Sequence, residues 1–214
     1  MRKIWLVGVV VLAACMGRPA LSDTGLQGAA RNFPPMIPGA STRPVSGGVA
    51  LRSCPARGGV VERKGGPTTL YLGANPANPD LCRAQVGTET VEAWYGIWRT
   101  SWPGADQAYA ALTKLIRGST GDVEAFDVLM APGYHYHDLI RNEGVEDIKL
   151  LGNTYRAIKL AHYREGFGGN TYRSVSTVWK DLPTGLLIYG TYQHISGAPV
   201  IDDPLIPTRI APSP

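Results

Sequence analysis

The fold is decided by residues 145–196, which read VEDIKLLGNTYRAIKLAHYREGFGGNTYRSVSTVWKDLPTGLLIYGTYQHIS. Runs rich in β-branched and aromatic residues alternate here with short segments that carry Gly, Asn or Pro. Such runs are typical of strands. The breaks at Gly152-Asn153, at 166–170 and at 181–185 have the composition of hairpin turns. The stretch therefore predicts a meander of antiparallel strands.

Shorter strands are expected upstream of this meander. Their composition and their flanking Gly, Pro and Asn residues predict them at 49–53, 59–63, 68–72, 123–130 and 134–141, with 88–100 as a strand or a strand pair. The segment 73–80 contains Asn-Pro twice and predicts a loop. This loop would bring Cys82 back towards Cys54.

One helix is expected over residues 105–117. Pro103-Gly104 precedes it and Gly118 ends it. Its apolar stripe consists of Ala108, Leu112, Leu115 and Ile116. A helix of this length needs a surface that covers such a stripe, and the sheet provides one. The predicted fold class is α+β, mainly β: a curved antiparallel sheet or partly open barrel, built as a meander, with one amphipathic helix packed on it.

The first fifteen residues carry a targeting signal. Arg2 and Lys3 form a positive region, residues 4–12 an apolar one, and Leu-Ala-Ala precedes Cys15. This segment resembles the lipobox of bacterial lipoproteins. The resemblance implies diacylation of the Cys15 thiol, cleavage before Cys15 and acylation of the new amino terminus. In that family an Asp after the cysteine commonly marks inner-membrane retention, so Met16 points to the outer membrane, facing the periplasm.

Two alternatives remain for this segment. It could be an ordinary secretory signal that is cut elsewhere, for example after Ala20, or a short membrane helix. About nine apolar residues are too few to span a bilayer, which argues against the membrane helix.

The expected organisation follows from composition. Residues 1–14 are the signal peptide, 15–48 a flexible tether, 49–197 one β-rich domain and 198–214 a Pro-rich tail that docks on the domain or binds a partner. Cleavage leaves 214 minus 14, or 200 residues, and the loss of Arg2 and Lys3 lowers the formal charge from +4 to +2. This charge gives no reason to expect a nucleic-acid partner.

Cys54 and Cys82 remain when Cys15 is assigned to the lipid anchor. A pair of cysteines in an oxidising compartment predicts a disulfide, which typically stabilises a fold by about 2–4 kcal/mol. A metal pair or a reactive thiol would need shorter spacing or a flanking histidine.

The segment Tyr134-His-Tyr-His-Asp138 is the candidate metal site. A strand would place His135 and His137 on one face, where His162 or His194 could complete a ligand set. In the alternative, the tyrosines of this strand lie in the core and both histidines lie on its solvent-exposed face. Because the pattern is short and common, no metal site is assigned.

Trp94, Trp98 and Trp102 are the candidates for ligand stacking. Their even spacing would put all three indoles on one side of a strand. If exposed, the row could stack on sugar rings or contact lipid. If buried, it contributes to the core.

No motif indicates catalysis or a cofactor. The chain has no Gly-x-Ser-x-Gly elbow, no His-Glu-x-x-His, no phosphate loop and no dinucleotide fingerprint. The carboxylates are scattered, and none can be given an acid or base role from the sequence.

A strand that ends in Trp179 is followed by a Pro-x-Gly turn and by Leu186-Leu-Ile-Tyr189. This pattern resembles the hairpin of half-barrel envelope proteins in the lipoprotein-carrier, LolA/LolB-like group. The resemblance covers about twenty residues and implies a curved sheet, lined with apolar residues, that holds acyl chains. The chain has one predicted helix where that group uses more, and no binding residues carry over.

The leading functional expectation is a non-catalytic, lipid-anchored envelope lipoprotein that binds an envelope protein or glycan. It is held to the membrane by its lipid and needs no cofactor. The alternative is a carrier or chaperone for lipids or acyl chains, which would need a cavity of several hundred cubic ångströms. A metal-dependent hydrolase using His135 and His137 is a distant third.

Overall fold

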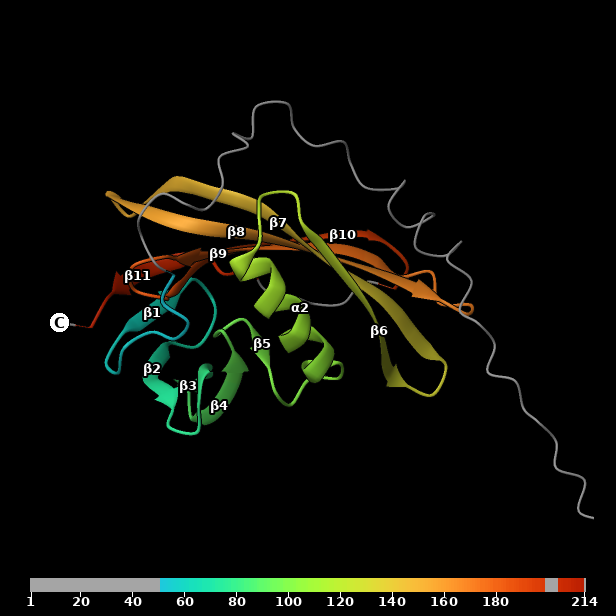
Figure 1. Cartoon of the computed structure of the whole chain (residues 1–214), viewed down its shortest axis with the longest axis horizontal. Coiled ribbons are helices and arrows are strands. Elements are labelled where there is room, and N and C mark those ends of the chain that lie inside the picture. Colours follow the sequence, from blue (N-terminus) through green and yellow to red (C-terminus); the bar gives the residue numbers. More distant parts are fainter. Residues whose placement is uncertain (1–50, 199–203, 214) are drawn as a thin grey trace, which may run out of the picture. The chain divides into compact units, whose positions relative to one another are not determined.

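The computed structural model describes residues 51–198 and 204–213, which belong to one compact unit. The expected signal peptide, Cys15 and the tether lie outside these residues. Two open antiparallel sheets and one helix make up the described part, which confirms the mainly β fold class (Figure 1). That helix is neither long nor apolar enough to cross a membrane.

The first sheet has six strands in the order β11-β1-β2-β3-β4-β5. Their bounds are β1 Val60–Arg63, β2 Thr69–Asn75, β3 Asn78–Val86, β4 Glu89–Trp94, β5 Trp98–Arg99 and β11 Pro207–Ala211. The second sheet has five longer strands in the order β10-β9-β8-β7-β6. Their bounds are β6 Val123–Ala131, β7 Tyr134–Leu150, β8 Asn153–Phe167, β9 Arg173–Asp181 and β10 Leu187–Ser196. The predicted meander is this second sheet.

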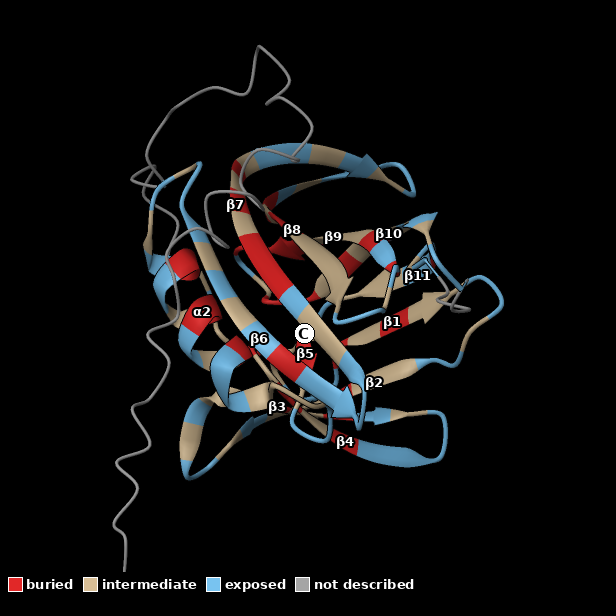
Figure 2. Cartoon of the chain, turned by 90° about the vertical axis from the view of Figure 1, so that its right-hand side faces the viewer, coloured by how far each residue is buried: buried red, intermediate tan, exposed pale blue. Residues whose placement is uncertain are grey.

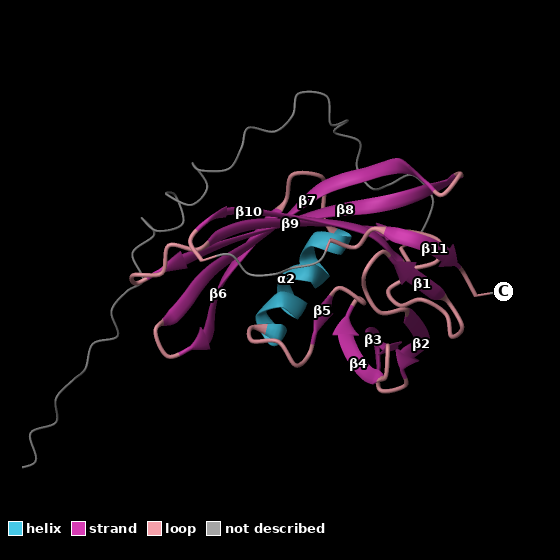
Figure 3. Cartoon of the chain, turned by 180° about the vertical axis from the view of Figure 1, so that it is seen from behind, coloured by secondary structure: helices cyan, strands magenta, loops and turns pink. Residues whose placement is uncertain are grey.

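The helix of the described part, α2, spans Ala105–Arg117 as predicted. Its apolar stripe is buried against the second sheet and against β4 and β5 of the first. Figures 1 and 3 show α2 and the first sheet on the same side of the second sheet. Figure 2 shows the buried stripe of α2 and the buried middle of β7 in red. One face of the long sheet is therefore covered along part of its length.

Two apolar clusters form the core. The first joins α2 to the second sheet through Tyr95, Trp98, Leu112, Leu115, Ile140, Ile158, Leu160 and Leu182, with smaller alanines between them. The second joins the two sheets through Val61, Tyr71, Ala84, Val91, Ala157, Trp179, Leu186 and Ile188. Both clusters draw on β8, so this central strand links them.

Strand β7 is longer than predicted. The sequence indicated separate strands at 134–141 and from 145, but one strand runs from Tyr134 to Leu150 with a register shift between Asn142 and Gly144. Gly144 has a φ of 98°, which only glycine adopts readily. The Asn142 side chain accepts from the Gly144 N–H at 2.8 Å and donates to the Leu115 carbonyl at 2.8 Å. A bulge therefore replaces the expected break.

The predicted loop at 73–80 is wrong, because this segment forms the hairpin between β2 and β3. The Asn75 side chain accepts from the Ala77 N–H, and the Asn78 side chain accepts from the Asp80 N–H, both at 2.9 Å. These short side-chain bonds close the turn locally. Pro79 lies at a register shift, where a missing N–H is tolerated.

Residues 51–59 form no strand, so the expected strand at 49–53 is not found in its described part. The predicted disulfide between Cys54 and Cys82 is confirmed, with a Cα–Cα distance of 5.2 Å. It fastens the irregular segment before β1 to the middle of β3. The tail contributes β11, which pairs antiparallel with β1 from Val60↔Ala211 to Arg63↔Pro207.

Candidate functional site

A pocket of about 430 Å³ lies on the face of the second sheet that also meets α2. Its lining comes from β5 and the residues next to it, from α2, from the strands of the second sheet and from the segment before β11. Most of these side chains are apolar, and fewer are polar. The apolar lining is Ile97, Trp98, Trp102, Pro103, Leu112, Met130, Ile140, Leu160, Val178, Leu187, Pro204 and Leu205. The polar lining is Arg63, His162, Arg164, Tyr172, Ser174, Ser176, Thr191 and Tyr192.

Strand alternation explains which side chains face the pocket. Residues two apart on a strand share a face, and paired residues on neighbouring strands lie side by side. Register therefore places three rows across β8 and β9: Arg164 beside Ser174, His162 beside Ser176, and Leu160 beside Val178. All six side chains line the pocket.

Asp138 lies on β7, on the same face as the lining residue Ile140, and is fully buried, with 0% exposure. It sits opposite Arg164 in the β7–β8 register. The guanidinium donates from Nε to Oδ1 at 2.7 Å and from Nη2 to Oδ2 at 2.6 Å, a bidentate geometry. Nε2 of His162 lies 3.3 Å from Oδ1 but makes no hydrogen bond of good geometry.

The charge of Asp138 is maintained by these neighbours. Burial would raise the pKa of the Asp138 carboxyl, but Arg164 and His162 outweigh burial and hold that pKa below its ordinary value. For Arg164, burial would lower the pKa, but the carboxylate of Asp138 outweighs burial and raises it. Both members of the pair are therefore ionised at neutral pH.

Arg164 is also held by aromatic rings. Its guanidinium carbon lies 5.0 Å from the ring centre of Tyr136 and 6.0 Å from that of Trp98. The Trp98 ring meets His162 edge-on, with 5.1 Å between the ring centroids. Stacking and ion pairing together fix the orientation of the arginine at the pocket floor.

Two buried ring nitrogens at this pocket have no hydrogen-bond partner within residues 51–198 and 204–213. They are Nε1 of Trp98 and Nε2 of His162. Buried polar atoms are nearly always hydrogen-bonded in folded proteins, because an orphaned one keeps its desolvation cost. Four other buried side-chain atoms of the described residues are in the same state, and His162 has the Asp138 carboxylate 3.3 Å away, so these nitrogens do not by themselves identify a ligand site.

The predicted row of tryptophans is split by a turn. Trp94 lies on β4 and Trp98 on β5, and the two strands pair with each other, so a single strand carrying all three indoles was wrong. Positive φ angles at Tyr95 and Gly96 allow the turn. Trp94 stacks on Tyr109 of α2, 4.2 Å away between ring centroids.

The other two tryptophans line the pocket. Trp98 is buried, whereas Trp102 is 48% exposed and meets Trp98 edge-on with 6.0 Å between centroids. Trp102 therefore lies where the pocket meets solvent. Ligand stacking remains a prediction for these two.

The candidate metal residues do not converge. His137 pairs with Asp127 and stacks on Phe167, whose ring centroid is 4.3 Å away, and the tilted ring of His135 lies 5.3 Å from the same centroid. Strand alternation turns both away from the face that carries Asp138. No group of three His, Cys, Asp or Glu side chains that could hold a metal occurs in the described part of the chain.

The remaining two histidines lie apart from this pair. His162 belongs to the pocket. Nε2 of His194 lies 3.1 Å from the carbonyl of Gly197, at the end of its own strand. The suggested sharing of ligands between strands is therefore not supported by the geometry.

A second buried charged group lies outside the pocket lining. Lys180 follows Val178 along β9 and is 0% exposed. Its ammonium group donates to the Gly185 carbonyl. Burial lowers the pKa of Lys180 to about 7, and the neighbouring Asp181 offsets this only in part. The Asp181 carboxylate accepts from the hydroxyl and N–H of Thr184 in the adjacent turn.

No family model, curated protein or solved structure matches this chain.

Proposed function

We propose that this chain is a non-catalytic, lipid-anchored binding protein of the bacterial cell envelope that carries one small amphipathic molecule in its pocket. The observation that supports this most is the pocket itself. Its volume of about 430 Å³ falls in the range of roughly 300–1,000 Å³ that is usual for small-molecule sites. A mainly apolar lining with a few converging polar groups is also usual for such sites.

The carboxylates of the described residues favour binding over acid–base catalysis. None occurs among the lining residues in the part of the chain that the structure describes. Asp138, which is paired with the lining residue Arg164, is buried, and both of its oxygens accept hydrogen bonds from Arg164. An ionised carboxylate held in this way cannot donate a proton, and Arg164 already engages the oxygens with which it would accept one.

The membrane anchor is the part of the proposal that rests on the lipobox. Acylation at Cys15 would hold the protein on the membrane, because several acyl chains together anchor stably where one does not. Residues 15–48 would then act as a tether for the folded part. Replacing Cys15 by Ser should abolish incorporation of labelled palmitate and release the protein from membranes.

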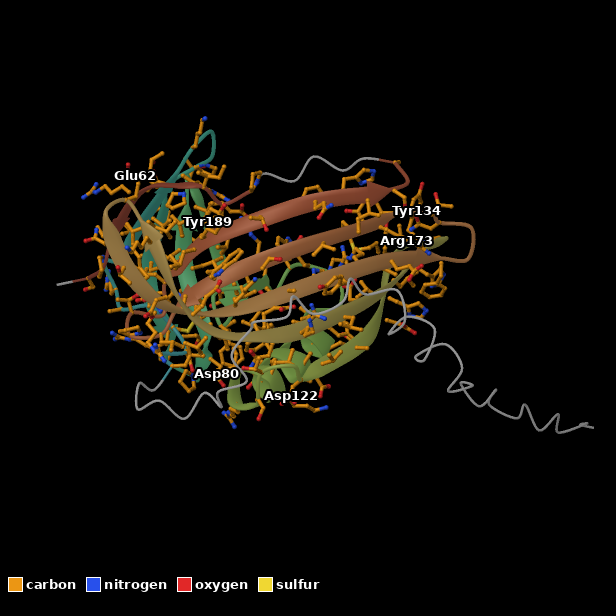
Figure 4. The ribbon with its side chains drawn as sticks, turned by 90° about the horizontal axis from the view of Figure 1, so that it is seen from above. Glu62, Asp80, Asp122, Tyr134, Arg173 and Tyr189 are labelled. Carbon is orange, nitrogen blue, oxygen red and sulfur yellow. A yellow bond between two sulfur atoms is a disulfide. The ribbon has the colours of Figure 1, made fainter. Side chains whose placement is uncertain are left out.

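A second candidate, contact with an envelope protein or glycan, is favoured by apolar side chains at the tip of the β6–β7 hairpin. Leu129 and Tyr134 are largely exposed there, and Trp102 is exposed at the pocket. Figure 4 shows Tyr134 and Arg173 at one end of the long sheet and Tyr189 at the other. Exposed apolar groups of this kind often mark contact surfaces.

Native mass spectrometry of the full chain, recovered from the envelope, tests the carrier function. The expected spectrum contains a species whose added mass matches one amphiphile. Val178→Trp should abolish this species, because Val178 lines the pocket and the larger ring fills it. Val175→Trp is the matched control, since Val175 lies on the same strand but faces the other side of the sheet. Retention of the amphiphile by the Val178→Trp variant would refute the proposal.

A further inference from the structure

We propose that the pocket selects a ligand with an anionic head group, a carboxylate or phosphate, joined to a single apolar chain. This inference rests on the proposed carrier function and specifies its ligand. Arg164 on β8 would bind the head group, and the apolar end of the same pocket would receive the chain.

The pocket is amphipathic along its length. On β8 the facing residues run from Arg164 through His162 to Leu160, and on β9 from Ser174 through Ser176 to Val178. The two gradients are in register, so polar lies beside polar and apolar beside apolar. Leu187 and Leu205 extend the apolar end, and Arg63, which pairs with Pro207 two residues after Leu205, lies on that side of the pocket. A ligand with one polar end and one apolar end matches this arrangement.

The charges at the pocket favour an anion over a cation. Within residues 51–198 and 204–213, the ionisable residues of the lining are Arg63, Arg164, His162 and two tyrosines, with no Asp or Glu among them. Asp138, which accepts both hydrogen bonds from Arg164, is fully buried. Among the described lining residues a cationic ligand would therefore meet arginine and no carboxylate.

Hydrogen-bond donors are available where the head group would lie. A guanidinium has five N–H groups, and the bidentate bond to Asp138 uses two of them. Ser174 and Ser176 add hydroxyl groups that can donate. A group that only accepts hydrogen bonds, such as a carboxylate or phosphate, would satisfy these donors.

Asp138 acts here as a positioning residue. Its two bonds hold the plane of Arg164, and Tyr136 and Trp98 flank the same guanidinium. The arginine therefore loses little side-chain freedom when a ligand binds, which lowers the cost of binding. A volume of about 430 Å³, at the lower end of the usual range, suits one chain better than several.

Isothermal titration of the full chain at pH 7 tests the inference. The protein carries Cys15→Ser, which removes the thiol that the lipobox would acylate and avoids detergent. The probes are decanoate, decyl phosphate, 1-decanol and decyltrimethylammonium. Decanoate or decyl phosphate should bind at least about tenfold tighter than 1-decanol, a ratio that corresponds to about 1.4 kcal/mol. Decyltrimethylammonium should bind most weakly.

The double variant Asp138→Asn/Arg164→Gln separates charge recognition from folding, because it leaves no unpaired buried charge. It should bring the decanoate-to-decanol ratio to about one while the affinity for 1-decanol changes less than about twofold. Arg173→Gln is the control, since Arg173 is exposed and pairs with Glu165 outside the pocket lining. This control should keep the wild-type ratio.

Each outcome separates the two proposals. If no probe binds, the carrier function itself fails. If 1-decanol binds as tightly as the anions, or if the double variant keeps the anion preference, the carrier function stands and the inference about the head group is overturned. Tighter binding of decanoate would favour a fatty acid as the ligand, and tighter binding of decyl phosphate would favour a phosphate ester with one acyl or alkyl chain.

Discussion

Asp138 and Lys180 are both completely buried on the same sheet, yet burial has opposite outcomes for their charges. Asp138 is ion-paired with Arg164, and its pKa is held down so that it stays charged. Among the described residues Lys180 donates a hydrogen bond to a backbone carbonyl alone, and its pKa falls to about 7, so it can lose its charge. The sheet therefore buries ionisable groups in two ways: Asp138 keeps its charge beside a counter-charge, whereas Lys180 has a lowered pKa that allows it to become neutral.

The largest change in stability is expected when the buried ion pair between Asp138 and Arg164 is broken. Arg164→Met would leave Asp138 buried with only the His162 ring beside it, and breaking a buried ion pair in this way typically costs about 3–5 kcal/mol of unfolding free energy. Urea denaturation at pH 7 measures this loss. The double variant Asp138→Leu/Arg164→Met should recover most of the stability, because no buried charge remains. Equal stability of the single and double variants would show that the pairing is unimportant.

The next largest effect is a pH dependence of stability that arises from Lys180. Between about pH 7 and its ordinary pKa of 10.5, Lys180 binds a proton in the unfolded chain but not in the folded one. Stability should therefore rise with pH in this window, by about 1.4 kcal/mol per unit at most, or about 2.7 kcal/mol from pH 7.5 to 9.5.

Lys180→Met should remove this slope and should be more stable than wild type at neutral pH. Urea denaturation across the pH series measures both. Parallel curves for the two proteins would mean that Lys180 is not the titrating group.

Lowering the pH should remove the stabilisation that the ion pair between Asp138 and Arg164 provides. The folded pKa of Asp138 lies below its unfolded value of 3.8, so its stabilising contribution is present above that value and is lost as pH falls through the folded pKa. The loss should be about 1.5–3 kcal/mol, the usual contribution of a hydrogen bond to a charged group. Asp138→Asn should flatten the curve below about pH 4. An unchanged acid limb in this variant would assign the loss to other carboxylates.

The smallest change in stability is expected at the exposed ion pair between His137 and Asp127. The side chains of His137 and Asp127 are 45% and 56% exposed. Exposed ion pairs contribute roughly 0–1 kcal/mol, so His137→Ala should change stability by no more than about 0.5 kcal/mol. Thermal unfolding at pH 6 and pH 8 checks this. If His137→Ala lowered the unfolding free energy as much as Arg164→Met does, burial could not explain why the buried pair contributes more than the exposed pair.

Local signals made the helix and most strands predictable from the sequence. Gly104 and Gly118 flank α2, and its apolar stripe has the spacing of a helix, so its bounds could be read directly. The bulge at Gly144 could not, because an isolated glycine in a strand is equally compatible with a turn. The β2–β3 hairpin was missed because Asn-Pro pairs also favour loops.

The candidate site was mostly hidden from the sequence. Alternation along β7 already placed Tyr136 and Asp138 on the face opposite His135 and His137. The partner of Asp138 depends on the register of β8, which a bulge shifts partway along the pairing. Asp138 and Arg164 are 26 residues apart in the chain, and no local pattern connects them. His162 was singled out as a metal ligand, whereas its neighbours in the structure are Trp98 and Asp138.

The docking of β11 on β1 sets the order in which the binding site can assemble. Glu62 and Arg209, which form an ion pair between these strands, are separated by 147 residues. Leu205, just before β11, lines the pocket, and its carbonyl accepts from the Gly190 N–H at 3.0 Å. At a synthesis rate of about 5–20 residues per second, the 11 residues from Ser196 to Pro207 take about 0.5–2 s, so the long sheet is complete before the segment that completes the pocket. Until then the apolar floor is open, and it is the surface that a chaperone would need to shield.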